Sequence, residues 1–136
     1  MPTTRRTFAV SAAAPLLLAA CSSSSRPASH TISATVEGGR QTVRLVGTAG
    51  NAWSPNAVSA AAGDLTVTML VPGGTPHDFQ IEAVAGSKMG LISRGESRSL
   101  TVHLTPGTYR FVCTIHSGMD GKIVVTSPAP TTATPS

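Results

Sequence analysis

The chain has 136 residues, 40% of them hydrophobic and only 12% charged, which is enough for one small domain and argues against a coiled coil or a strongly charged face. Its formal net charge of +4 includes Arg5 and Arg6, which lie in a segment that we expect to be removed. The remaining eight basic and six acidic residues are spread along the sequence without a cluster, so the charge pattern excludes nucleic-acid binding.

The first 21 residues are typical of an export signal. A basic pair is followed by an apolar run over 8–20, too short to span a bilayer comfortably, and by small residues before Cys21. "TRRTF" resembles the twin-arginine export motif, and "LAAC" resembles the lipobox of bacterial lipoproteins, whose cysteine becomes the lipidated first residue. An ordinary helix is the alternative, but Pro15 interrupts the run. We therefore expect a signal peptide at 1–21 and lipid on Cys21.

The segments on either side of the central region have the composition of flexible chain. Residues 22–29 ("SSSSRPAS") and 127–136 ("SPAPTTATPS") lack the apolar side chains that a packed structure needs. We expect a tether at 22–29, one folded domain at 30–126 and a disordered tail at 127–136. With lipid on Cys21, the protein would be exported, and it would be anchored to the outer face of the cytoplasmic membrane or periplasmic.

Alternating apolar and polar residues predict β-strands throughout the central region. The pattern is seen at 42–48 ("TVRLVGT"), 65–71 ("LTVTMLV"), 99–105 ("SLTVHLT") and 108–113 ("TYRFVC"). Turn signals separate these runs, among them "EGG", "PGG" and "TPGT". Several short strands without a helical period predict an all-β fold, an antiparallel sandwich or barrel.

Four side chains that could carry chemistry have ordinary structural explanations. His103 lies on the polar face of its predicted strand, and His30 lies at the start of the domain, so we expect both in solvent. Asp64 in "AAGD" is expected in a turn, and Met89 in "GSKMG" is expected in a loop.

Cysteine content draws attention to the stretch "CTIHSGM", residues 113–119. With Cys21 lipidated, Cys113 has no partner for an intramolecular disulfide in an oxidising compartment. The thiol is therefore either buried as a small hydrophobic group or occupied by a ligand. His116 and Met119 follow at intervals of three residues, which a tight loop can fold around one point.

The fourth group of such a site is expected to be His77, in "PGGTPHDF" at the end of the predicted strand 65–71. A thiolate, two imidazoles and a weak thioether are the ligands of a blue-copper electron-transfer centre. Thiolate and thioether favour Cu(I) while imidazoles hold Cu(II), so such a site changes little on electron transfer. The residues thus predict one bound copper ion.

Two longer segments resemble the cupredoxin family of blue, type 1 copper proteins. "GTYRFVCTIHSGMDGKIVV" (107–125) is similar to its C-terminal ligand loop, in the short C-x2-H-x2-M form of amicyanin, pseudoazurin and plastocyanin-like members. "WSPNAVSAAAGDLTVTMLVPGGTPHDF" (53–79) is similar to the segment that leads to the first histidine ligand. The resemblance implies a Greek-key β-sandwich or barrel with copper at one end. It also implies that His77, Cys113 and His116 are equatorial ligands and Met119 the axial one.

The sequence departs from the family pattern beside two ligands. Asp78 stands where the family commonly has Asn, and an ionised carboxylate accepts hydrogen bonds but cannot donate one toward the cysteine sulfur. Because such neighbours tune a metal, we expect an altered potential or stability. Ile115 stands where a proline is common before the second histidine, which leaves an extra backbone donor and a looser hinge.

The expected function is electron transfer by a membrane-tethered, monomeric protein with one type 1 copper, in which His116 is the solvent-facing ligand. Its expected partners are a redox donor and a redox acceptor, in addition to the membrane. A copper-trafficking or storage lipoprotein with the same ligands is the alternative. A copper enzyme would need a second site with several more histidines, and the chain has four in all. No Gly-x-Ser-x-Gly motif supports hydrolysis, so we expect no enzymatic activity.

Overall fold

The computed structural model describes residues 30–128. The expected signal peptide at 1–21 with Cys21, the expected tether at 22–29, and the expected tail from residue 129 onward lie outside the described residues. Every regular element within 30–128 is a strand, as expected, so this part of the chain holds no helix that could cross a membrane.

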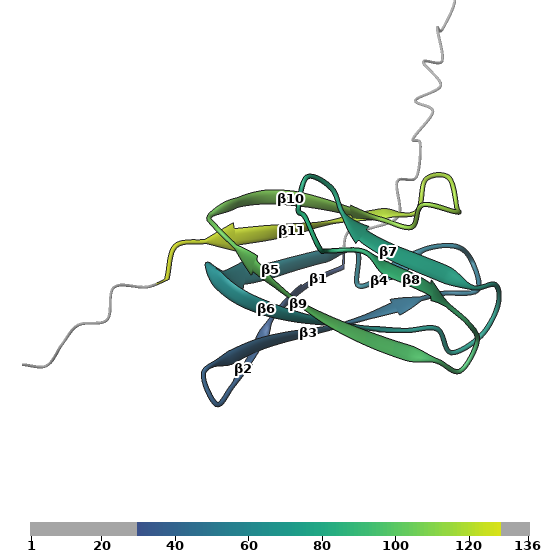
Figure 1. The fold of residues 1–136 in the computed structure, drawn as a ribbon, viewed down its shortest axis with the longest axis horizontal. Coiled ribbons are helices and arrows are strands. Elements are labelled where there is room, and N and C mark those ends of the chain that lie inside the picture. Colours follow the sequence, from purple (N-terminus) through teal and green to yellow (C-terminus); the bar gives the residue numbers. More distant parts are fainter. Residues whose placement is uncertain (1–29, 129–136) are drawn as a thin grey trace, which may run out of the picture.

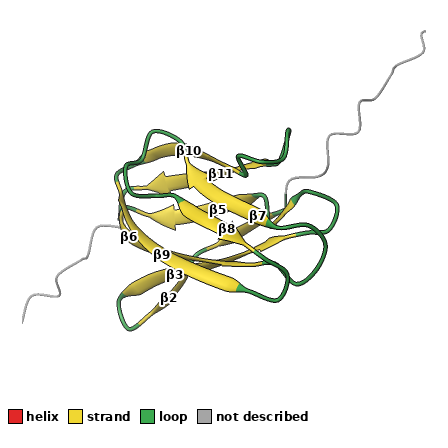
Figure 2. Cartoon of the chain, turned by 45° about the vertical axis from the view of Figure 1, so that its right-hand side comes forward, coloured by secondary structure: helices red, strands yellow, loops and turns green. Residues whose placement is uncertain are grey.

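The strands form two sheets that face each other as a sandwich (Figure 1). The first sheet has the order β1 (Thr31–Ser33), β5 (Ala57–Ala61), β11 (Asp120–Thr126), β10 (Gly107–Val112), β7 (His77–Ile81) and β8 (Met89–Ile92). The second has the order β2 (Thr35–Glu37), β3 (Arg40–Gly47), β6 (Gly63–Leu70) and β9 (Ser97–Leu104), and β4 (Trp53–Ser54) pairs with β3. Figure 2 shows the two layers of strands joined by loops at both ends.

Both sheets are mixed, so the expectation of an antiparallel arrangement was wrong. Strand β5 runs parallel to both β1 and β11, and β3 runs parallel to β6. The reason is the path of the chain, which leaves the second sheet after β4, adds β5 to the first sheet and returns to the second sheet with β6. A strand that returns after such a crossover can lie parallel to its neighbour.

The core between the sheets confirms the predicted alternation. Leu65, Val67 and Met69 of β6 are completely buried, while Thr66 and Thr68 between them lie on the outer face. The opposite sheet contributes other fully buried side chains, among them Phe79, Ile81, Phe111 and Ile123. Removing each large apolar side chain from water contributes about 1.5–3 kcal/mol to folding.

Gln41 joins the two sheets at one end of the sandwich. Its side-chain amide donates to the carbonyl of Ala61 at 2.9 Å and accepts the N–H of Ala61 at 2.7 Å. Because Gln41 lies near the start of β3 and Ala61 at the end of β5, this pair connects a strand of the second sheet to a strand of the first.

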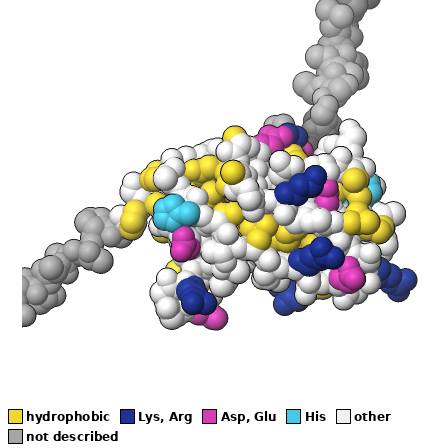
Figure 3. Space-filling model, viewed as in Figure 1, with side chains coloured by type: hydrophobic (Ala, Val, Ile, Leu, Met, Phe, Trp, Pro, Cys, Tyr) yellow, Lys and Arg dark blue, Asp and Glu magenta, His cyan; other side chains and the backbone are white. Residues whose placement is uncertain are grey.

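Two residues expected in turns or loops lie in strands. Asp64 belongs to β6 and its carboxylate contacts Nδ1 of His103 on β9 at 2.7 Å. His103 itself is exposed, as expected. Met89 begins β8, where it is buried opposite Phe79. On the face drawn in Figure 3, basic and acidic side chains lie among one another, which agrees with the absence of a polyanion-binding pattern.

Candidate metal centre

Two neighbouring strands of the first sheet bring the predicted site residues together. His77 begins β7, and Cys113 follows directly after β10. Because β7 and β10 pair antiparallel, with Val112 opposite Gln80, the start of one strand and the end of the other lie at the same edge of the sheet. The loop 113–119 then adds His116 to this edge before β11 begins.

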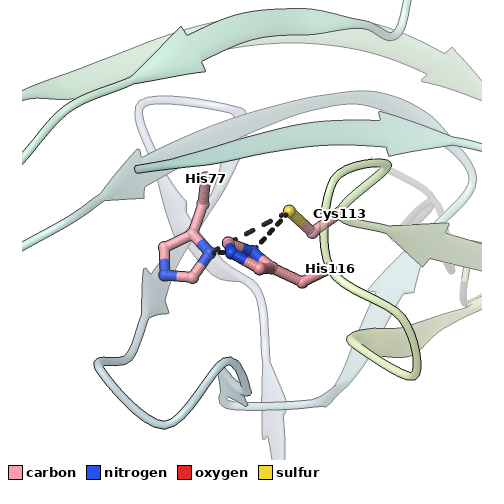
Figure 4. A group of neighbouring side chains, drawn as sticks. All are labelled: His77, Cys113 and His116. Carbon is pink, nitrogen blue, oxygen red and sulfur yellow. Dashed lines mark hydrogen bonds between the residues drawn. The ribbon is translucent and has the colours of Figure 1, made fainter. Parts of the chain in front are cut away.

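Three possible metal ligands converge at this edge (Figure 4). Nδ1 of His77 lies 3.1 Å from Nδ1 of His116, and Sγ of Cys113 lies 3.4 Å from the latter atom and 3.9 Å from the former. His77 and Cys113 are buried and His116 is half-buried. Such a cluster of nitrogen and sulfur atoms suits a single cation.

The imidazole of His77 is held with Nδ1 directed into this cluster. Its Nε2 lies 3.1 Å from the carbonyl oxygen of Thr48, which can only accept a hydrogen bond. Burial lowers the pKa of His77 below its ordinary value, and the charge of His116 lowers it further, although the Thr48 hydrogen bond and Asp78 oppose this. The ring is therefore neutral with its proton on Nε2, and Nδ1 carries a free lone pair.

Gly47 makes room for this imidazole. A Cβ atom at Gly47 would lie only 2.6 Å from Cδ2 of His77. The ring also lies against Trp53, with ring centroids 6.3 Å apart. Residues from β3 and β4 therefore fix the position of the candidate ligand His77 on β7.

Cys113 is a buried free thiol that lies beside both imidazoles. Burial raises the pKa of the thiol, and the carboxylate of Asp78 raises it as well, while the backbone N–H groups of Asp78 and Ile115 oppose the shift. Metal binding replaces the proton of a cysteine, because the thiolate is the form that binds. One thiolate with two imidazoles is a donor set that fits copper.

Met119 ends the loop 113–119, and its backbone lies next to that of Cys113. Its side chain is 2% exposed. Its carbonyl oxygen accepts the backbone N–H of Cys113 at 3.0 Å and the indole N–H of Trp53 at 3.2 Å. These two hydrogen bonds close the loop 113–119 and hold both of its ends against the core.

Asp78 is buried next to His77 and binds the ligand loop. Its carboxylate accepts the backbone N–H of Thr114 at 2.5 Å and also the hydroxyl of Thr114. Burial alone would raise the pKa of Asp78, but the hydrogen bonds from Thr114, together with the Cys113 thiol and the charge of Lys88, outweigh it, so the pKa lies below its ordinary value. The carboxylate is therefore an ionised acceptor.

Other residues noted in the sequence are not part of this cluster. His30 is exposed, and its backbone N–H binds the side chain of Asn56. His103 pairs with Asp64 near the start of β6, whereas His77 lies beside Gly47 at the end of β3, which runs parallel to β6. Ile115 is 51% exposed on the ligand loop.

Sequence reasoning missed four residues that support the ligands: Gly47, Thr48, Asn51 and Thr75. Thr48 acts through its backbone carbonyl, which any residue has, so no sequence signal could identify it. The run "GTAGNA" at 47–52 does carry turn-forming residues, and Asn51 has a φ of 53°.

The sequence matches the family described as "Cupredoxin-like domain" over residues 10–125. No curated protein is similar enough in sequence to match. The fold is similar to that of the copper-containing nitrite reductase of Thermus scotoductus SA-01, with 21% identity and a TM-score of 0.54 over 73% of this chain. The chain spans only 28% of that reductase chain.

Two smaller proteins have a similar fold. One is the metal-binding domain of the Cu(I)-exporting P-type ATPase CopA of Streptococcus pneumoniae D39, with 18% identity and a TM-score of 0.59, over 73% of this chain and 98% of that chain. The other is a mutant of amicyanin in its oxidized state, with 25% identity and a TM-score of 0.52, over 62% of this chain and 82% of that chain.

Proposed function

The chain belongs to the cupredoxin-like domain family and has copper as its cofactor, and from this premise we propose that it carries single electrons between extracytoplasmic redox partners. The observation that carries the proposal is the convergence of Cys113, His77 and His116, whose ligand atoms all lie within 4.8 Å of one another. Bound copper would supply the one-electron couple between Cu(II) and Cu(I).

We assign three strong ligands and one weak ligand. Sγ of Cys113, Nδ1 of His77 and Nδ1 of His116 would be the strong donors to copper, and the sulfur of Met119 would be the weak donor. Asp78 does not bind the metal in this proposal; it tunes the site through its charge and its hydrogen bonds to Thr114.

The surroundings of these residues favour electron transfer over chemistry on a substrate. The Thr48 carbonyl orients His77, and the Met119 carbonyl holds the backbone of Cys113, so the ligands keep one arrangement. A site that does not rearrange has a small barrier to electron transfer. His116 is the most exposed of the three equatorial ligands, which makes its ring the route by which electrons enter and leave.

We do not expect an enzyme. A catalytic copper site would need several further histidines, and the chain has four in all. Two of them are assigned here, while His30 and His103 are exposed. The proposed unit is a monomer with one copper ion.

The location of the protein is also a proposal. In this scheme residues 1–21 are a signal peptide, 22–29 a tether, 30–126 the copper domain and 127–136 a tail, and Cys21 carries lipid. The lipid would keep the copper domain at the outer face of the membrane, close to a donor and an acceptor. Cys21→Ser should release the protein from the membrane fraction of cells, and continued membrane retention would contradict the anchor.

A copper-trafficking or storage protein is the second candidate, since it could use the same four ligands. The CopA domain with a similar fold was solved with Cu(I), so a protein of this fold can bind the reduced ion. Trafficking predicts fast transfer of copper to a metal-free acceptor together with slow electron exchange. Electron transfer predicts the opposite order of rates.

The test is to add an equimolar amount of Cu(II) to the full-length chain and record visible absorption and EPR spectra. An intense thiolate-to-Cu(II) charge-transfer band with a narrow hyperfine splitting would support the proposal. Cys113→Ser should abolish the band, and Met119→Gln should keep the copper but shift the potential, while His103→Ala serves as a control that changes neither. A pale, tetragonal Cu(II) spectrum would favour copper handling.

A further inference from the structure

Thr75, a side chain outside the ligand set, contacts the outer edge of His116, and Asn51 contacts Thr75 in turn. The hydroxyl of Thr75 lies 3.4 Å from Nε2 of His116, and the same hydroxyl donates to the side-chain oxygen of Asn51 at 3.1 Å. All three residues lie at the surface, His116 being half-buried and the other two exposed. Together they form a short hydrogen-bonded chain from the ligand to the loop 48–52.

The direction of both hydrogen bonds made by Thr75 follows from the single proton of its hydroxyl group. A threonine hydroxyl has one proton, and in this chain Thr75 donates it to Oδ1 of Asn51, which is an acceptor only. Thr75 can therefore only accept from His116, so Nε2 of His116 is the donor in this contact and carries a proton. In the neutral imidazole Nδ1 then has a free lone pair, and this is the atom that faces Cys113 and His77.

The loop 48–52 contacts His77 directly and reaches His116 through Thr75. The Thr48 carbonyl accepts from Nε2 of His77 at 3.1 Å and from the backbone N–H of Asn51 at 3.1 Å. The side chain of Asn51 reaches His116 through Thr75. One five-residue loop thus fixes the same tautomer in two ligands that come from different parts of the chain.

The loop 48–52 packs closely against the segment that carries Gly74 and Thr75. This packing supports a defined geometry for the contact between Asn51 and Thr75. Gly74 lies so close to Ala49 that a Cβ atom at Gly74 would be 2.6 Å from the Cα of Ala49. Thr75 and Asn51 follow these two residues by one and two positions. Asn51 has a φ of 53°, in the left-handed region, which asparagine tolerates better than most residues.

We propose that Asn51 and Thr75 are positioning residues that lock His116 in the tautomer and orientation required of a ligand; this inference rests on the proposed function. The lock acts before the metal binds, since it needs only side chains of this chain. It also gives the exposed edge of the electron-carrying imidazole a polar cap instead of free solvent. The cap should keep the ring in one orientation in both oxidation states.

The experiment uses the full-length chain with uniform nitrogen-15 labelling, in the metal-free form and loaded with Cu(I), which is diamagnetic. Ring nitrogen shifts of the metal-free protein report the tautomer of each histidine, and the Cu(I) form reports how fast the Nε2 proton exchanges with water. Thr75→Val removes the hydroxyl but keeps the branched shape. It should raise the Nδ1–H population of His116 in the metal-free form and speed exchange of its Nε2 proton about fivefold, the value of one modest hydrogen bond.

Matched variants separate the cap from a general structural effect. Thr75→Ser keeps the hydroxyl and should retain the wild-type shifts and exchange rate, while Asn51→Gly keeps the left-handed backbone but should reproduce the effect of Thr75→Val. His77, whose proton is held by a backbone carbonyl, is the internal control and should not change. Unchanged His116 shifts and exchange in both Thr75→Val and Asn51→Gly would overturn the inference. Absence of the charge-transfer band from wild-type protein loaded with Cu(II) would instead overturn the proposed function.

Discussion

Asp78 accepts two hydrogen bonds from Thr114, one from the backbone N–H and one from the hydroxyl. This pair connects the strand that carries the first histidine to the loop that carries Cys113. The carboxylate thus ties these two segments together, and it places a buried negative charge beside Cys113. Asp78 is only 5% exposed, so solvent screens that charge weakly.

The first prediction concerns Asp78→Asn, which should raise the reduction potential of the copper site. The carboxylate stabilises the more positive Cu(II) form, and the amide removes this charge while keeping one acceptor for Thr114. An electrostatic change of about 1.4 kcal/mol corresponds to roughly 60 mV for a one-electron couple. Redox titration of the blue band measures the shift.

Asp64→Asn is the matched control for this charge. It removes an exposed carboxylate near the start of β6, away from the edge that carries His77. Its potential should equal that of the wild type. A potential for Asp78→Asn that stays constant or falls would show that the buried charge does not act on the metal.

The second prediction concerns the backbone N–H of Ile115, which lowers the pKa of the Cys113 thiol. An N–H directed at the sulfur favours the electron-rich reduced site, so Ile115→Pro should lower the reduction potential, by an amount on the order of 50 mV. Ile115→Ala keeps the N–H and removes only the exposed side chain. If both variants shift the potential equally, the side chain and not the N–H is responsible.

The sequence predicted the buried faces of the strands because burial follows a period of two. Leu65, Val67 and Met69 are fully buried as the alternation required. The same alternation occurs in parallel and antiparallel strands, so it could not reveal that β3 and β6 run parallel. That relationship depends on the crossover through β4 and β5, which no local pattern encodes.

The sequence identified the residues at the centre of the site but not the residues that hold them in position. Spacing in "CTIHSGM" and the position of His77 identified residues that the fold brings together. The supports at Thr48 and Thr75 depend on contacts between loops far apart in the chain. Asp64 was mistaken for a turn residue because Gly63, with a φ of 126°, makes the change of direction by itself and β6 begins there.

The third prediction concerns Gly47→Ala, which should displace the imidazole of His77. The new methyl group would lie 2.6 Å from Cδ2 of the ring, too close for an ordinary contact. Overpacking of this kind costs about 1–3 kcal/mol. Thermal unfolding of the metal-free chain should therefore occur at a lower temperature, and the charge-transfer band of the copper form should weaken or move.

Gly73→Ala is the control for Gly47→Ala, since a Cβ atom there meets nothing within 4 Å. It should leave both the unfolding temperature and the band unchanged. A wild-type spectrum in Gly47→Ala would mean that the His77 ring is not confined by β3.

The fourth prediction is that Gln41→Leu should lower the stability of the fold without changing the metal site. Loss of the amide leaves the N–H and carbonyl of Ala61 without the partners that join the two sheets, which should cost about 1–3 kcal/mol of unfolding free energy. Gln41 pairs with Leu65 near the start of β6, whereas the ligands lie beyond the end of β3, so the copper spectrum should not change. Denaturant unfolding of the metal-free chain measures the first effect, and Glu37→Gln on exposed β2 should change it by less than about 0.5 kcal/mol. A shifted band in Gln41→Leu would show that contact between the sheets at this end controls the ligand geometry at the other.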